Sequence, residues 1–152
     1  MLSQAMWECY LASPGAPARG SATYEECSFC DNEHDANTLA ELVRAGRKTG
    51  TCSSLWEYQH GQEALPQAGA YRVVIDWSGQ AVCVIRLVAV RIVPYQMVDA
   101  TFAWQEGEGD GSLQYWRDTH WAWFSRVLPE IGLNATPEMP LVCETFERVF
   151  PL

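Results

Sequence analysis

The chain has 152 residues, of which 48% are hydrophobic, and a formal net charge of −9 at pH 7. This composition excludes a disordered chain, and the length favours a single domain. The negative charge disfavours binding of long duplex DNA, because proteins that grip duplex phosphates present a basic face. No segment reaches the roughly 18 apolar residues of a membrane span, and no secretory signal is recognisable, so we expect a cytoplasmic protein without a membrane partner.

The N-terminal part of the chain is predicted to contain two helices and one extended segment. Ser3–Ser13 has an amphipathic pattern and ends at a Pro/Gly-rich turn, after which a loop continues to about residue 34. Asp35–Arg47 forms the second helix, with apolar residues at spacings of three and four, and Asn37 or Asp35 is its predicted cap. Thr49–Trp56 is rich in Thr and Ser and is predicted to be extended.

Four further elements complete the predicted order. They are a hairpin, two helices and a final strand, at Tyr71–Val93, Pro94–Gln105, Ser112–Ile131 and Met139–Phe150. The second strand of the hairpin, Ala81–Val93, is almost wholly apolar, which predicts burial on both faces. Helices, strands, helices and a strand in this order indicate an α+β fold with a mixed or antiparallel sheet.

Positive charge is concentrated at Arg44–Lys48, where three of the ten Lys and Arg residues lie within five positions. In one interpretation, this charge at a helix end neutralises the helix dipole and has no further role. Alternatively, Lys48 is partly buried, has a lowered pKa and acts as a base that activates Thr51 as a nucleophile. Because positions 48 and 51 face opposite ways on a regular strand, the two side chains meet only if the chain still turns at Gly50.

Two further segments have both a structural and a functional interpretation. The sequence EGEGDG, Glu106–Gly111, is either a solvated turn or a loop that holds a carboxylate near Lys48, where it would tune the lysine and move a proton to a leaving group. Trp56 and Tyr58 alternate on the predicted extended segment and so share one face. They belong either to the core or to an aromatic wall that stacks on a base.

The cysteine and histidine residues do not predict a metal site. Cys27 and Cys30 have the spacing of half a zinc site, but no second pair follows at a matching spacing. His120 lies in a segment crowded with aromatic residues, where we interpret it as a packed, hydrogen-bonded core residue. The sequence contains no glycine-rich phosphate loop, and we expect neither a metal nor another cofactor.

Four segments, taken in order, resemble the ASCH domain family: LAELVRAGRKTGTCSSLWEY, VVIDWSGQAVCVIR, VPYQMVDATFAWQEGEGDGSLQYWRDTHWAWF and MPLVCETFERV. The resemblance extends over roughly Phe29–Val149. It implies one domain, residues 1–152, with residues 1–28 as an N-terminal helix and loop extension. It also implies a PUA-like fold, a small β-barrel of mixed or antiparallel strands flanked by helices.

The resemblance implies a cleft that accepts RNA or a modified nucleoside. In relatives that remove the acetyl group from N4-acetylcytidine, a Lys, a Thr three residues later and a Glu further on form the catalytic set. The matching residues here are Lys48, Thr51 and Glu106, with Glu108 as the competitor for the last role. The residues predicted to bind the substrate are Arg47, Ser54, Trp56, Tyr58 and Glu108.

Three functions are therefore expected in order of preference. The first is a hydrolase that acts on a modified nucleoside amide such as N4-acetylcytidine. The second is a ribonuclease that cleaves single-stranded RNA in the same cleft, with Lys48 stabilising phosphate charge. The third is a non-catalytic RNA-binding module, which the acidic charge balance disfavours. The expected partner is a small nucleoside or a short single-stranded RNA.

Overall fold

The structure is a computed structural model that describes residues 1–152. Its elements are α1 (Ser3–Leu11), β1 (Tyr24–Cys27), α2 (Glu33–Arg44), β2 (Gly50–Ser54), α3 (Leu55–Gly61), β3 (Tyr71–Ile75), β4 (Ala81–Pro94), η1 (Tyr95–Met97), α4 (Ala100–Glu106), α5 (Leu113–Val127), η2 (Leu128–Ile131) and β5 (Pro140–Phe150). The predicted α+β class is confirmed. None of the helices combines the length and the hydropathy that a membrane span requires.

The five strands form one mixed sheet in the order β1-β3-β4-β5-β2. β1 runs parallel to β3, and every other neighbouring pair is antiparallel. The long β4–β5 ladder shifts register twice, and such irregularities bend the strands that carry them. β1 and β2 are the two edges of this order, so the strand pairing shows a bent five-stranded sheet and does not show a closed barrel.

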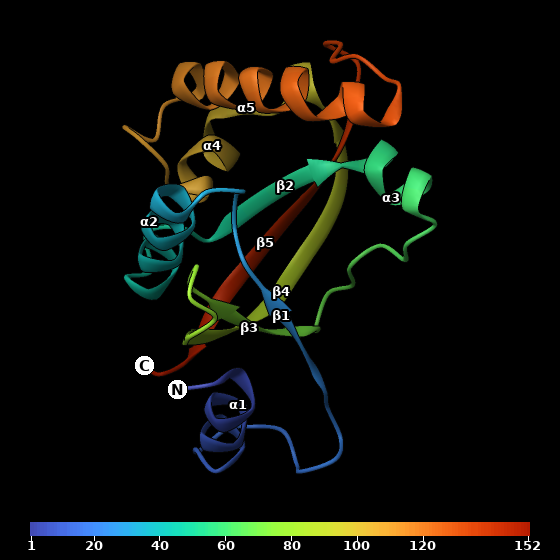
Figure 1. Ribbon diagram of the computed structural model, residues 1–152. Helices are drawn as coiled ribbons and strands as arrows, with labels where there is room; N and C mark the ends of the chain where they lie inside the picture. Colours follow the sequence, from blue (N-terminus) through green and yellow to red (C-terminus); the bar gives the residue numbers. More distant parts are fainter.

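Helices cover the sheet on several sides: in Figure 1, α1 lies at the bottom, α2 at the middle left, and α4 and α5 at the top. At one end, α1 and α2 pack on opposite faces of β3 and β4: Val73 and Val84 contact α1, whereas Val74 and Ile85 contact α2. At the other end, α4 and α5 bury an aromatic cluster against β5 and β2. The site described below lies between these two regions.

Only the first half of β4 is buried on both faces, as predicted for the whole strand. Cys83, Val84 and Ile85 are consecutive and buried. From Val88 onward the prediction is wrong, since Val88 and Ile92 are 53% and 46% exposed. Val88 and Ile92 belong to none of the three hydrophobic clusters that the helices cover, so these side chains stay exposed.

Helix α2 begins and ends earlier than predicted, and both boundaries have local causes. The side chain of Asn32 accepts a hydrogen bond from the Asp35 N–H at 2.9 Å and caps the helix, so neither Asn37 nor Asp35 is the cap. After Arg44 the chain turns through Gly46, which has a φ of 77°. This turn carries Lys48 away from the helix axis before β2 begins.

Two short elements differ from the sequence prediction. Leu55–Gly61 is the helix α3, started by the Ser54 hydroxyl, which accepts a hydrogen bond from the Trp56 N–H at 3.2 Å. Side chains two residues apart on a helix point about 200° apart. Trp56 and Tyr58 therefore do not share one face, and the prediction that they do is wrong. The strand β1 was predicted as loop, because its two central glutamates give no apolar alternation.

Candidate active site

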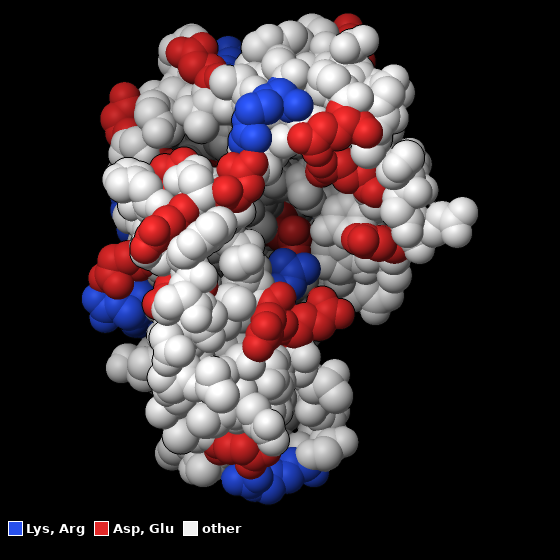
Figure 2. Space-filling view, viewed as in Figure 1, with Lys and Arg blue, Asp and Glu red and all other residues white.

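A cavity of about 300 Å³ lies between the edge strands β1 and β2. Its walls come from the end of β1, from β2, α3 and β5, and from the loop that follows α4, with α5 closing one side. Figure 2 shows a hollow on this face, between α2 and α3, with acidic and basic side chains gathered around it. The volume is at the lower end of the range of pockets that hold small ligands.

Lys48 lies at the bottom of this cavity as a paired ammonium group. Its side chain is 1% exposed, and its Nζ donates to Glu106 Oε2 at 2.9 Å and to Glu108 Oε2 at 3.3 Å. Burial acts to lower the pKa of Lys48, but the charges and hydrogen bonds of the two carboxylates outweigh it and raise the pKa. The expectation of a lowered pKa is therefore wrong.

The two carboxylates beside Lys48 differ in their proton affinity. Burial raises the pKa of Glu106, but Lys48 and His120 outweigh this effect and hold it well below its usual value. Glu106 Oε1 also accepts a hydrogen bond from the Trp116 indole N–H at 3.1 Å. For Glu108, burial prevails over the attraction of Lys48, and the pKa is raised. Glu106 is thus a fixed anion, whereas Glu108 is the carboxyl group that takes up a proton more readily.

Gly107 allows the Glu106–Glu108 segment to pack against Lys48. Its φ is 72°, and a Cβ at this position would lie 2.4 Å from the backbone oxygen of Arg47. Only glycine fits such a close approach in a left-handed conformation. The alternation of glycine and glutamate in this segment therefore places two carboxylates around one amine.

Thr51 lies on β2 and lines the same cavity as Lys48. Lys48 precedes the start of β2 at Gly50, so the alternation of strand side chains does not separate the two residues. In the register of β2 and β5, Thr51 lies opposite Glu144, and their side chains share one face of the sheet. No hydrogen bond joins Lys48 Nζ to Thr51 Oγ1 in this arrangement.

The other predicted binding residues divide into two groups. Tyr58 lines the cavity together with Glu108. By contrast, the Arg47 guanidinium stacks over the Trp104 ring at 3.9 Å, the Ser54 hydroxyl caps α3, and Trp56 packs against the aromatic cluster. The structure therefore brings Lys48, Thr51, Glu106, Glu108 and Tyr58 to one cavity and leaves the other three outside its lining.

His120 is both a packed residue, as predicted, and a member of the cavity wall. Its ring stacks on Trp116 with 4.3 Å between the centroids, and its Nδ1 lies 2.8 Å from the Trp116 carbonyl oxygen. Its Nε2 faces Glu106 Oε1 at 3.4 Å. Burial lowers the pKa of His120, but Glu106 outweighs it and raises the pKa.

The sequence interpretation missed a second ion pair in the cavity lining, between Arg72 and Glu144. Arg72 on β3 and Glu144 on β5 approach to 2.8 Å, between Nη1 and Oε1. Burial raises the pKa of Glu144, and Arg72 only partly offsets this. The available signal was a charged residue inside each of two otherwise apolar strands, YRVVI and PLVCETF.

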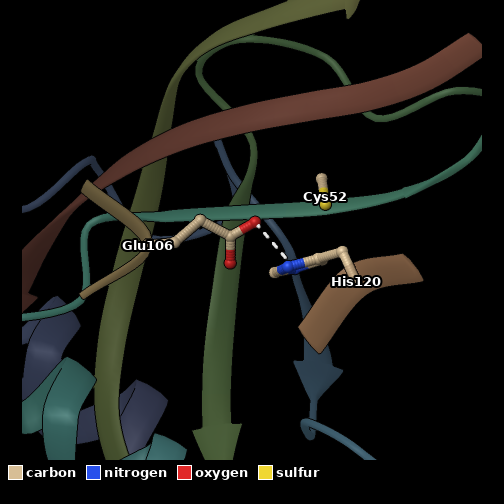
Figure 3. Close-up of side chains that lie close together, drawn as sticks. All are labelled: Cys52, Glu106 and His120. Atoms are coloured by element: carbon tan, nitrogen blue, oxygen red, sulfur yellow. Dashed lines mark ion pairs between the residues drawn. The ribbon is translucent and has the colours of Figure 1, made fainter. Parts of the chain in front are cut away.

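Cys52, Glu106 and His120 bring three possible metal ligands within 4.8 Å of one another (Figure 3). The oxygens of Glu106, however, already accept from the Lys48 ammonium and the Trp116 indole. Burial and Glu106 also raise the pKa of the Cys52 thiol well above its usual value, which opposes the thiolate that a metal needs. These side chains fit a hydrogen-bonded network better than a metal centre.

Comparison with known proteins agrees with this architecture. The family model described as the ASCH domain matches residues 25–150. The chain is similar to a crystal structure of an ASCH domain from Lactobacillus crispatus JV V101, with 35% identity and a TM-score of 0.89, over 96% of this chain and 92% of that one. It is also similar to a protein from Enterococcus faecalis V583, with 33% identity and a TM-score of 0.81, over 97% of this chain and 89% of that one. No curated protein matches the chain. With most of its length matched by the family model and by these structures, the chain belongs to the ASCH domain family.

Proposed function

We propose that this protein is a hydrolase that cleaves the amide of an acylated nucleoside such as N4-acetylcytidine. The observation that supports this function is the buried cluster of Lys48, Glu106 and Glu108 in the cavity that Thr51 also lines. Removing such charges from water costs several kcal/mol, and apolar residues at these positions would often stabilise the fold better. Their presence beside a hydroxyl favours a chemical role.

The proton affinities of the cluster support a particular sequence of steps. In the resting protein, Lys48 is an ammonium ion. A substrate that fills the cavity displaces water, which disfavours the charged forms of both Lys48 and Glu108. Lys48 therefore passes a proton to Glu108, whose pKa is already raised. The neutral amine then accepts the Thr51 proton while Thr51 Oγ1 bonds to the acyl carbon.

The remaining steps return every group to its starting state. The C–N bond breaks as Glu108 gives its proton to the departing nitrogen, which leaves an acyl ester on Thr51. Water then hydrolyses this ester, releasing the carboxylic acid and restoring the Thr51 hydroxyl. Glu106 keeps its charge throughout and positions Lys48, so we assign the acid role to Glu108 rather than to Glu106.

The charges around the cavity favour a neutral substrate. Four glutamates line it, whereas its cationic lining residues are Lys48 and Arg72. Phosphate groups would be repelled by this balance, which supports a nucleoside over an RNA chain. The ribonuclease alternative keeps one supporting feature, the His120 ring, which could move a 2′-hydroxyl proton.

Release of acetate from N4-acetylcytidine tests this proposal. We expect turnover by the wild-type protein and a loss of at least about a thousandfold in Thr51→Ala, as for the removal of other nucleophiles. Thr101→Ala, an exposed Thr on α4, is the matched control and should keep full activity. Turnover that persists in Thr51→Ala would rule out the mechanism, and RNA fragments with 2′,3′-cyclic phosphate ends would support the ribonuclease instead.

A further inference from the structure

We propose that Arg72 and Glu144 form a recognition subsite beside Thr51, which reads the edge of a base formed by the amide N–H and the adjacent ring nitrogen. The assignment rests on the proposed function and narrows its substrate class. The substrates would be N-acylated amino heterocycles with a ring nitrogen next to the acylated amine, rather than acylated amines in general.

The first support is unused hydrogen-bonding capacity inside the cavity. Glu144 is 3% exposed, and the one polar contact of its Oε1 is the ion pair with Arg72 Nη1 at 2.8 Å. The buried Ser53 Oγ, also in the cavity lining, lacks a hydrogen-bond partner. Buried polar atoms are almost always paired, so a hydroxyl without a partner and a carboxylate oxygen with a single contact, both facing a cavity, indicate a ligand group that completes them.

The second support is the position of Glu144 relative to the attacking hydroxyl. Thr51 and Glu144 are directly opposite each other in the β2–β5 ladder. Side chains at opposite positions have Cβ atoms about 4.5–5.5 Å apart. A group that donates to Glu144 must therefore lie next to the acyl carbon that Thr51 attacks. The amide N–H and the neighbouring ring atoms meet this requirement, whereas ribose hydroxyls lie on the far side of the base.

The third support is the pairing of donor and acceptor. In an N4-acylated cytosine, the N–H donor and the N3 acceptor lie side by side on one edge. A carboxylate accepts well from the cytosine N4 position, and a guanidinium offers fixed N–H donors to the adjacent acceptor. Arg72 and Glu144 present this complementary pair in contact with each other. An acylated alkylamine offers the N–H but leaves Arg72 without an acceptor.

Two ribose-free substrates test the assignment directly. N4-acetylcytosine has the ring nitrogen, and 4-acetamido-2-pyridone has a C–H in its place. For the wild-type protein we expect kcat/KM to favour N4-acetylcytosine by about 10- to 100-fold, as for one well-formed bidentate contact. This comparison needs no variant, and equal kcat/KM for the two compounds would overturn the assignment.

Variants then locate the preference. We expect Arg72→Met, which removes the donor to the ring nitrogen, to reduce it to about threefold or less. Because this change leaves the Glu144 carboxylate buried without its counter-ion, the double variant Arg72→Met/Glu144→Leu is measured beside it, and both are checked for cooperative melting. Glu147→Gln is the matched control: Glu147 lies on the same strand in an exposed ion pair with Arg86, and its variant should keep the full preference. A preference that survives in both site variants would contradict the proposal.

Calorimetric binding of the same two compounds separates this inference from the proposed function. If neither these compounds nor N4-acetylcytidine are turned over, the hydrolase proposal fails. Tighter binding of N4-acetylcytosine, lost in Arg72→Met, would still support the subsite, and equal binding would overturn it. N4-acetylcytidine and its free base are compared in the same way. If the nucleoside bound more tightly than the base and Glu144→Gln removed this difference, the subsite would hold ribose hydroxyls and the assignment would be wrong.

Discussion

Replacement of Lys48 by Met tests the charge state assigned to the cavity. The change removes the ammonium group that Glu106 Oε2 contacts at 2.9 Å and leaves a carboxylate that is 2% exposed without its counter-ion. Loss of one partner of a buried ion pair costs about 3–5 kcal/mol. Since Glu106 keeps the Trp116 N–H and the nearby His120, we expect the lower value, about 3 kcal/mol at pH 7. The corresponding fall in Tm is about 6–12 °C.

The sign of the pH dependence follows from the pKa of Glu106. In the wild-type protein this pKa is lowered. Glu106 therefore contributes to the free energy of unfolding at pH values above the pKa of Glu in the unfolded chain, about 4.3, and this contribution is lost as the pH falls. In Lys48→Met, burial is less opposed and should raise the same pKa. The contribution is then present at acid pH and is lost as the pH rises. The stability gap between the two proteins should therefore widen from pH 4 to pH 7.

Urea unfolding followed by tryptophan fluorescence measures this gap across the pH range. Lys48→Met/Glu106→Gln removes both charges and should recover at least half of the loss, because the unpaired carboxylate is gone. Arg44→Met, which breaks an exposed pair with Glu41, is the matched control and should cost less than about 1 kcal/mol. A gap that stays constant between pH 4 and pH 7 would refute the assignment of Lys48 and Glu106 as a buried ion pair.

Three further predictions concern the groups that hold the site in place. Gly107→Ala should lower the free energy of unfolding by more than about 2 kcal/mol, because the added Cβ would collide with the backbone of Arg47. Gly69 also has a positive φ, 89°, but open space around it, so the control Gly69→Ala should cost about 1–2 kcal/mol. Melting curves of the two variants compare these losses. Ser54→Ala removes the cap of α3 and should lower the urea midpoint by an amount equivalent to about 1 kcal/mol. Because the pKa of His120 is raised, the contribution of its charge to the free energy of unfolding is complete below about pH 6.5 and is lost at higher pH. Wild-type stability should therefore fall above that pH, and the fall should be smaller in His120→Gln. Urea titrations at several pH values measure it.

The elements that the sequence predicted well are those with local causes. The hairpin turns at Asp76–Gln80, and the helix α5 follows its N-cap at Ser112, because turn residues, capping groups and periodic apolar residues lie within the segments themselves. The strand β1 and the helix α3 were missed for the opposite reason. β1 exists through its parallel pairing with β3, whose residues lie 47 positions further along the chain, and the segment before α3 has the Thr and Ser content of a strand.

The candidate site shows the same division. Lys48, Thr51 and the glutamates of EGEGDG were selected from their residue types and from the family resemblance. Their placement in one cavity agrees with that selection, whereas Ser54 and Trp56 have structural contacts outside it. Arg72 and Glu144 were not selected, because a single charge in a strand gives no information about its partner on another strand.

The sequence by itself determined the α+β class, the family and the chemical types of the residues that meet in the cavity, because patterning and motif order are local properties of the chain. Only the tertiary structure decided that Lys48 is held as an ammonium ion, since the two carboxylates that raise its pKa are 58 and 60 positions away in the chain. The same long-range contacts separated the roles of Glu106 and Glu108. Burial and the distance between charges set proton affinity, and both arise only when the chain has folded.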